Sequence, residues 1–263
     1  MKLNIVPARA GWYWVKSGIG TFWRQPLAMS GLFLLFMGVV SLLSVVPLLG
    51  SIMALVLLPA ATLGLMAATR QAAEGRFPMP TVLATAFTAG KAQQMAMLKL
   101  GAMYAVGFLG VIASTAVFDG GAFAQMYLDG TALTEELAQS EGFQTALWVG
   151  MGLNLPLAML FWHAPALVHW HNVEPSKSLF FSAMACWKNK AAMLVFGACW
   201  VGVFMLGGLV VNIVGGVLGA QAVVSLLTLP AVMAMASMFF TSIYFTFRDS
   251  FTDESSATTP PEL

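Results

Sequence analysis

Long apolar stretches alternate with short polar segments along this chain. Residues 26–69 and 191–247 contain no Asp, Glu, Lys or Arg. A helix needs about 20 apolar residues to cross a bilayer, so each stretch predicts two spans joined by a turn. A third pair of spans is predicted on either side of the polar segment 119–141. The six predicted spans are residues ~26–47, ~51–70, ~100–118, ~143–168, ~191–214 and ~221–247.

Amphipathic segments precede each pair of spans. In residues 9–24 the apolar side chains recur at helical spacing, while Arg9, Lys16 and Arg24 fall on the other side. Such helices lie in the membrane interface, with tryptophans at headgroup level. The sequence therefore predicts an all-α fold: a polytopic membrane protein with six transmembrane helices as three hairpins, forming a single transmembrane domain over residues 1–253. Each hairpin follows an amphipathic interfacial helix, at 9–24, 81–94 and 176–189.

The two longest polar segments differ in their expected structure. Residues 119–141 carry acidic residues but no Lys or Arg, and predict an extracytoplasmic loop with a short helix capped by Thr134. Residues 254–263 are polar and rich in proline, which predicts a disordered cytoplasmic tail.

Composition and charge exclude several classes of protein. With 59% hydrophobic and 9% charged residues, the chain is too apolar for a soluble domain. Its net charge is +1 and its basic residues are dispersed, so no nucleic-acid partner is expected. All twelve Lys and Arg residues fall on one side of the six-span arrangement, which by the positive-inside rule predicts cytoplasmic N- and C-termini. The N-terminus lacks the pattern of a cleaved signal, so the mature chain is expected to begin at residue 1.

An internal repeat is predicted from two similar entries into a span. The sequence Trp23-Arg24-Gln25 before one span aligns with Trp187-Lys188-Asn189 before another, and residues 81–100 resemble the same unit more loosely. The alternative is that any protein obeying the positive-inside rule places aromatic and basic residues before a span.

A longer pattern resembles a known group of proteins. It consists of the runs Ala164-Pro165-Ala166-Leu167, Pro175-Ser176-Lys177-Ser178-Leu179-Phe180-Phe181-Ser182 and Cys186-Trp187-Lys188-Asn189. This pattern resembles uncharacterised bacterial inner-membrane proteins of the YciC-like type and the membrane domain of some glycerophosphodiester phosphodiesterases. The resemblance implies six or more spans with interfacial helices, in the bacterial cytoplasmic (inner) membrane. It supplies no catalytic residues.

Three histidines are the candidate metal ligands. His163, His169 and His171 lie close together in sequence, with Glu174 as a further donor. On a helix, however, His169 and His171 point about 200° apart. The spacing therefore favours an aromatic belt at the interface, in which His163 and His169 lie beside Trp162 and Trp170. A metal site is the less favoured alternative, and no cofactor is expected.

Inside the spans the chain offers little chemistry. No Asp, Glu, Lys or Arg lies in a span core, which disfavours an ion-coupled carrier. We expect a non-enzymatic protein, an accessory or scaffold component of a membrane system or of envelope homeostasis. The alternative is binding or transport of an apolar or lipid-like molecule, with Asn154, Pro156, Pro165 and Asn212 lining a cavity. The bilayer is the expected partner, and a membrane-protein partner or homo-oligomer is left open.

Overall fold

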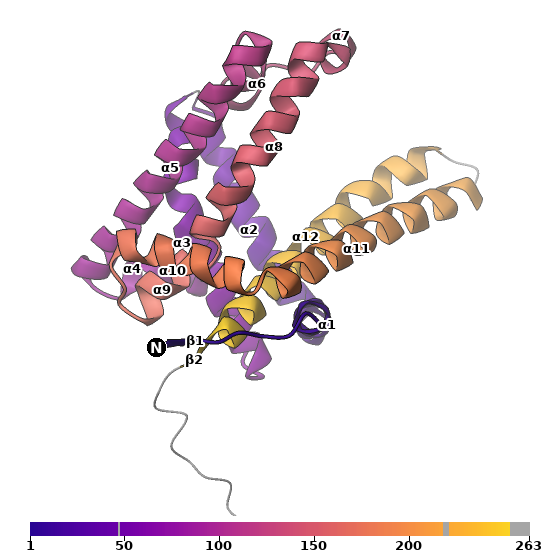
Figure 1. The fold of residues 1–263 in the computed structure, drawn as a ribbon. Coiled ribbons are helices and arrows are strands. Elements are labelled where there is room, and N and C mark those ends of the chain that lie inside the picture. Colours follow the sequence, from indigo (N-terminus) through magenta and orange to yellow (C-terminus); the bar gives the residue numbers. More distant parts are fainter. Residues whose placement is uncertain (47, 218–220, 253–263) are drawn as a thin grey trace, which may run out of the picture. The chain divides into compact units, whose positions relative to one another are not determined.

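The computed structural model describes residues 1–46, 48–217 and 221–252, without the side chains of 221–223. In this part of the chain, six helical segments are long and apolar enough to cross a membrane. They confirm the predicted all-α, polytopic membrane fold (Figure 1). The segments are α2 (Pro26–Ser44), α3 (Leu49–Ala73), α5 (Lys91–Asp119), α8 (Glu141–Phe161) with α9 (Ala164–Trp170), α11 (Lys190–Val217) and α12 (Gln221–Ser250).

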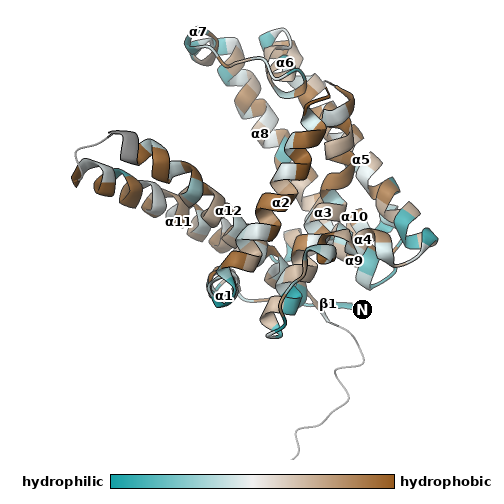
Figure 2. Cartoon of the chain, turned by 180° about the vertical axis from the view of Figure 1, so that it is seen from behind, coloured by the Kyte–Doolittle hydropathy of each residue, from teal (hydrophilic) through white to brown (hydrophobic). Residues whose placement is uncertain are grey.

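Exposed apolar side chains cover most of these helices. In the most apolar 18-residue stretch of α11, 11% is buried inside the protein. Figure 2 shows hydrophobic residues along the length of this helix. Such a surface is unstable in water and is stable against lipid tails. The helices therefore contact the bilayer directly.

The chain divides into two compact units, a finer division than the single domain expected from the sequence. The first unit comprises Met1–Phe36, Gly64–Thr85 and Ala185–Leu263, and the second comprises Met37–Leu63 and Ala86–Met184. Helix α3 contributes its first part to the second unit and its last part to the first unit.

The first unit is built around α1 (Ala10–Arg24), which packs against α11 and α12. Two glycines permit the close approach. A methyl group on Gly11 would lie 2.2 Å from the carbonyl oxygen of Ala192, and one on Gly18 would lie 2.5 Å from Cβ of Ser242. Trp14 is 1% exposed between them. One side of this predicted interfacial helix is therefore packed inside the protein.

The two ends of the described chain meet in the first unit. Strands β1 (Lys2–Leu3) and β2 (Phe251–Thr252) pair antiparallel. Asn189, which is 2% exposed, joins three segments at this point. Its Oδ1 accepts a hydrogen bond from the backbone N–H of Val6 (2.9 Å), and its Nδ2 donates to the carbonyl of Asn4 (3.1 Å) and to Oγ of Ser250 (3.2 Å).

The core of the second unit lies where α5 packs against α8 and α9. Gly101 of α5 lies against α3, where an added methyl group would come within 1.9 Å of the carbonyl oxygen of Val56. Aromatic contacts extend the core, including an edge-to-face contact between Tyr104 and Phe161 at 5.1 Å between ring centroids. The buried cluster comprises Ala60, Leu63, Ala86, Met97, Leu100, Leu157, Phe161, Ala164 and Val168.

The segment expected as one interfacial helix over 81–94 has a different local structure. A 3-10 helix, η1 (Pro80–Ala84), is followed by α4 (Thr85–Thr88), and α5 begins at Lys91. Gly90 separates them with φ 102°, a conformation that side chains other than glycine rarely adopt. Residues 91–94 therefore belong to the long helix that continues into the third span.

The fourth span also contains a break. Helix α8 ends at Phe161, and α9 begins at Ala164 with Pro165 in its first turn. Proline is favoured there because the first N–H groups of a helix have no intrahelical partner. The next helix is α10 (Pro175–Lys188), and the single residue Asn189 separates it from α11.

The acidic segment between the third and fourth spans contains two short helices, α6 (Ala122–Leu128) and α7 (Glu135–Gln139). The predicted cap is confirmed, because Oγ1 of Thr134 accepts a hydrogen bond from the N–H of Leu137 at 3.3 Å. Hydrophilic residues gather at α7 in Figure 2. The predicted disordered tail, 254–263, lies outside the described residues.

Candidate functional site

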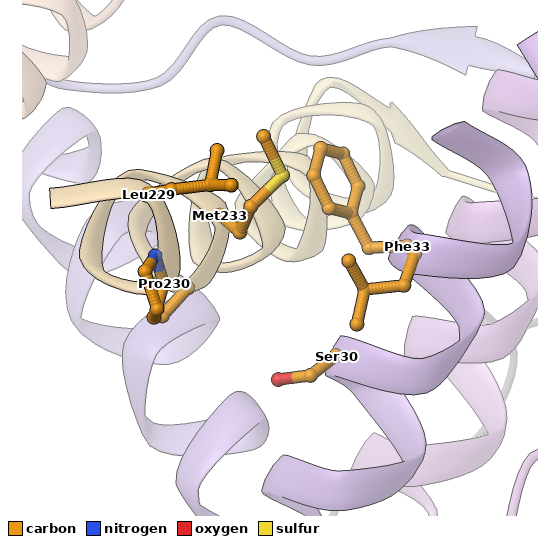
Figure 3. A pocket seen from close by; sticks show the side chains of 7 residues that line it. Ser30, Phe33, Leu229, Pro230 and Met233 are labelled. Atoms are coloured by element: carbon orange, nitrogen blue, oxygen red, sulfur yellow. The ribbon is translucent and has the colours of Figure 1, made fainter. Parts of the chain in front are cut away.

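An apolar pocket lies between α2 and α12 in the first unit (Figure 3). Its volume is ≈ 360 Å³. Two of its lining residues, Leu34 and Leu229, are 53% and 63% exposed, so the pocket is open to the outer surface of the helices. The lining residues are Ser30, Phe33 and Leu34 of α2 and Leu229, Pro230, Met233 and Ala234 of α12.

Contacts beside the pocket hold the two helices together. Oγ of Ser237 donates a hydrogen bond to the carbonyl of Met29 at 3.1 Å, and both groups are buried. The rings of Phe33 and Phe240 lie 5.5 Å apart between centroids. Because Ser237 lies four residues after Met233, one face of α12 contacts α2 through Ser237 and Phe240 and lines the pocket through Met233.

The residues of α12 at the pocket explain why the helices leave space there. Pro230 has no N–H, so it cannot form the α-helical hydrogen bond to the carbonyl of Leu226. Ala234 has a short side chain, which fills little of the space between the helices. Proline inside a membrane helix is tolerated where local adjustments satisfy the freed backbone group.

The lining restricts what the pocket can bind. Ser30 supplies the single side-chain hydroxyl, and every other lining side chain is hydrocarbon or thioether. No titratable side chain lines the pocket, so its lining offers no general acid or base and nothing that would activate the Ser30 hydroxyl as a nucleophile. Its volume lies at the lower end of the range for small-molecule sites. The pocket therefore suits a hydrocarbon chain.

The three histidines lie around α9. His163 is fully buried before the first turn, where its backbone N–H donates to Oγ of Ser182 at 2.9 Å. The aromatic belt expected for His163 and His169 stays a prediction. The carbonyl of His169 accepts a hydrogen bond from Nε2 of Gln93 (2.8 Å), and His171 follows the last turn. Within the described ranges, no group of three or more His, Cys, Asp or Glu side chains could hold a metal ion.

The four residues expected to line a cavity occupy different environments. Asn154 lines a separate pocket of ≈ 170 Å³ formed by α5, α6 and α8, but Pro156 and Pro165 do not line it. Pro156 is exposed within α8, and Pro165 is buried in the first turn of α9. Asn212 is exposed on α11, where its side-chain amide donates to the carbonyl of Gly208 at 2.8 Å.

The cysteines offer no reactive thiolate in the segments outside the spans. Cys186 lies in α10, where burial raises its thiol pKa to about 12. The sulfur is therefore protonated at neutral pH and a poor nucleophile. Cys199 lies within the span α11 and is half-buried.

Sequence reasoning missed the pocket between α2 and α12. It considered the prolines at 156 and 165 but not Pro230, which interrupts the longest uncharged stretch. That proline and the neighbouring Ala234 were the available signals on α12. Ser30, the polar member of the lining, is one of several serines in apolar stretches and has no distinguishing neighbour in the sequence.

Comparison with known proteins identifies a relative of nearly the same length. It is a protein of Burkholderia thailandensis with the name "Probable inner membrane protein BTH_II0599", 35% identical over 254 residues, which are 95% of this chain and 94% of the relative. The chain belongs to the same family as this protein. The family and the six spans make the chain a multi-pass protein of the bacterial inner membrane. No family model and no solved structure matches the chain.

Proposed function

We propose that this protein is a non-enzymatic accessory or scaffold component of the inner membrane that binds an apolar or lipid-like molecule between α2 and α12. The observation that carries the proposal is the pocket itself, which combines a hydrocarbon lining with a single hydroxyl and exposed lining residues. The acyl chain of a surrounding lipid enters such a site without crossing a polar barrier.

The chemistry of the lining supports binding without turnover. The pocket holds no titratable group, and the resemblance to YciC-like proteins supplies no catalytic residue. Within a bilayer such an apolar site binds its ligand through van der Waals packing, because the surrounding lipid tails are as apolar as the lining. We propose that any role in envelope homeostasis follows from this binding and from contacts with other membrane components.

We also propose an orientation of the protein in the membrane. The pairing of β1 with β2 places both ends of the described chain side by side. This fits the six spans, because an even number of crossings returns the chain to the side on which it began. With the basic residues facing the cytoplasm, both ends lie there, and the acidic segment with α6 and α7 lies outside.

A pair of variants on α12 tests the binding. In Ala234→Trp, the indole fills the pocket, whereas in Val232→Trp it is added at a residue that is 40% exposed and lines no part of the pocket. We expect native mass spectrometry of the gently extracted protein to show a retained lipid-like molecule in the unmodified chain and in Val232→Trp, but not in Ala234→Trp.

Two results would contradict the proposal. One is an unmodified protein that retains no lipid-like molecule after exchange into several detergents. The other is equal retention in Ala234→Trp and Val232→Trp, provided that both variants unfold at the temperature of the unmodified protein. Turnover by the purified protein would refute the non-enzymatic part alone.

A further inference from the structure

A second pocket in the first unit is basic and lies at the ends of two spans. It is lined by α1 together with Ala73, at the end of α3, and Phe245 and Arg248, near the end of α12. Its volume is ≈ 480 Å³, and it shares no lining residue with the apolar pocket. The residues that α1 contributes are Tyr13, Lys16, Ser17, Gly20, Thr21 and Arg24.

Three cations converge on this pocket from two helices. Lys16 and Arg24 lie on α1, and Arg248 lies on α12. In the part of the chain that the structure describes, neither Lys16 nor Arg24 forms a hydrogen bond or ion pair through its side chain. Their charges are therefore available to a ligand.

The neighbouring acids are already paired with other groups. Asp249 accepts hydrogen bonds from the guanidinium of Arg248 (2.8 Å) and from Nε1 of Trp14 (2.9 Å). Glu74 follows Ala73 and pairs with Arg70 and Arg76. With Asp249 offsetting Arg248, the pocket keeps an excess of two positive charges, those of Lys16 and Arg24.

Polar groups and open space accompany the cations. The hydroxyl-bearing residues Tyr13, Ser17 and Thr21 line the same pocket. A methyl group on Gly20 would meet nothing within 4 Å, so this part of α1 leaves room for a ligand. Charge-assisted hydrogen bonds from Lys and Arg, together with hydroxyl donors, are the usual means of binding phosphate groups.

The surroundings of the pocket indicate that the phosphate belongs to a lipid. Trp12 and Trp23, on the same helix, are 53% and 64% exposed, and tryptophan concentrates at the headgroup level of a bilayer. Phe245 and Ala73 provide an apolar wall beside the cations. Basic pockets at the cytoplasmic ends of membrane helices bind anionic headgroups.

We propose that this basic pocket binds the headgroup of an anionic phospholipid. Lys16, Arg24 and Arg248 contact the phosphate, and the hydroxyls of the pocket complete its hydrogen bonds. The site holds α1 at the membrane surface and selects the lipid that surrounds the first unit. This headgroup site goes beyond the proposed function, because it consists of other residues and recognises negative charge instead of a hydrocarbon chain.

The test compares two lipids with the same acyl chains, phosphatidylglycerol and phosphatidylcholine. The full-length protein is equilibrated with each in mixed micelles, and bound lipid is measured by native mass spectrometry. Each cation near a headgroup contributes about a fivefold change in affinity, so two excess charges predict a preference of about 25-fold for phosphatidylglycerol. The preference should fall with rising salt concentration.

Matched variants assign the preference to the pocket. The double variant Lys16→Gln/Arg24→Gln should remove it, whereas Lys16→Arg/Arg24→Lys, which keeps both charges, should retain it. Arg9→Gln loses one charge at an exposed residue that does not line the pocket, and should also retain it. Ala234→Trp should leave it unchanged, which separates this site from the apolar pocket.

Three outcomes would overturn the inference. Equal affinity for the two lipids would show that the pocket does not distinguish an anionic headgroup from a zwitterionic one. A preference that persists in Lys16→Gln/Arg24→Gln would place the anion site elsewhere. Binding of inorganic phosphate as tight as that of phosphatidylglycerol, with competition between them, would assign the pocket to a free anion.

Discussion

Single residues determine how α1 is held in the first unit. Gly11 and Gly18 are seven positions apart, so they lie on the same face of the helix, and Trp14 is buried between them. The indole N–H of Trp14 donates to Asp249, at the end of α12. Small residues at a helix contact allow the backbones to approach closely, and the tryptophan then fills the remaining space.

Replacing either glycine by alanine should destabilise the protein. The added methyl groups would lie 2.2 Å from the carbonyl oxygen of Ala192 and 2.5 Å from Cβ of Ser242, so α1 must shift. We expect Gly11→Ala and Gly18→Ala each to lower the free energy of unfolding by about 1–3 kcal/mol, the usual cost of overpacking. Denaturation in detergent, followed by tryptophan fluorescence, measures the change.

Gly20→Ala is the matched control on the same helix. A methyl group there meets nothing within 4 Å, so its stability should equal or slightly exceed that of the unmodified protein. If all three variants were equally stable, the close packing of α1 against α11 and α12 would be refuted.

At the scale of elements, the breaks between helices follow from a few backbone constraints. Gly90, with its positive φ, separates α4 from α5, and Pro165 lies in the first turn of α9 after the break at Trp162 and His163. Two further junctions occupy the aligned positions of the proposed repeat. Gln25 separates α1 from α2, and Asn189 separates α10 from α11. The repeat itself stays a prediction.

The backbone at Gly90 leads to a prediction for the entry into the third span. Its φ of 102° and ψ of 161° lie in a region almost restricted to glycine. Gly90→Ala should therefore destabilise the protein by about 1–3 kcal/mol. Thermal unfolding in detergent, monitored by circular dichroism, measures the loss.

Gly110→Ala provides the comparison within α5. Gly110 is helical, and a methyl group there meets nothing within 4 Å, so no loss of stability is expected. Similar unfolding temperatures for Gly90→Ala and the unmodified protein would show that the chain does not need this conformation to begin α5.

At the scale of the whole molecule, charge and chain pairing together support one topology. The segment 119–141 contains no Lys or Arg. In the six-span arrangement predicted from the sequence, all twelve Lys and Arg residues of the chain lie on the opposite side of the membrane from this segment. The β1–β2 pair joins the two ends of the described chain. If the basic residues at one end of the chain were neutralised, those at the other end and most of the remaining Lys and Arg residues would still keep this side of the protein in the cytoplasm.

Reporter fusions test this topology. A green fluorescent protein fused to the C-terminus should fluoresce, because it folds in the cytoplasm. Alkaline phosphatase fused after Gly130, between α6 and α7, should be active, because its disulfides form outside the cytoplasm. The reverse pattern, an inactive phosphatase and a dark fluorescent fusion, would contradict the proposed orientation.

The sequence by itself determined the fold class and the short helix capped by Thr134. A bilayer demands continuous apolar length for each span, and a cap depends on residues only three apart, so both are local properties of the chain. Only the tertiary structure decided which side of α1 is buried, where the two pockets of the first unit lie, and that Asn189 joins the ends of the described chain. Nearly every residue in a span is apolar whether it faces lipid or protein, so hydropathy cannot distinguish the two. The deciding contacts depend on side-chain size, at Gly11 and Gly18, and on hydrogen bonds between distant segments, such as Trp14 with Asp249.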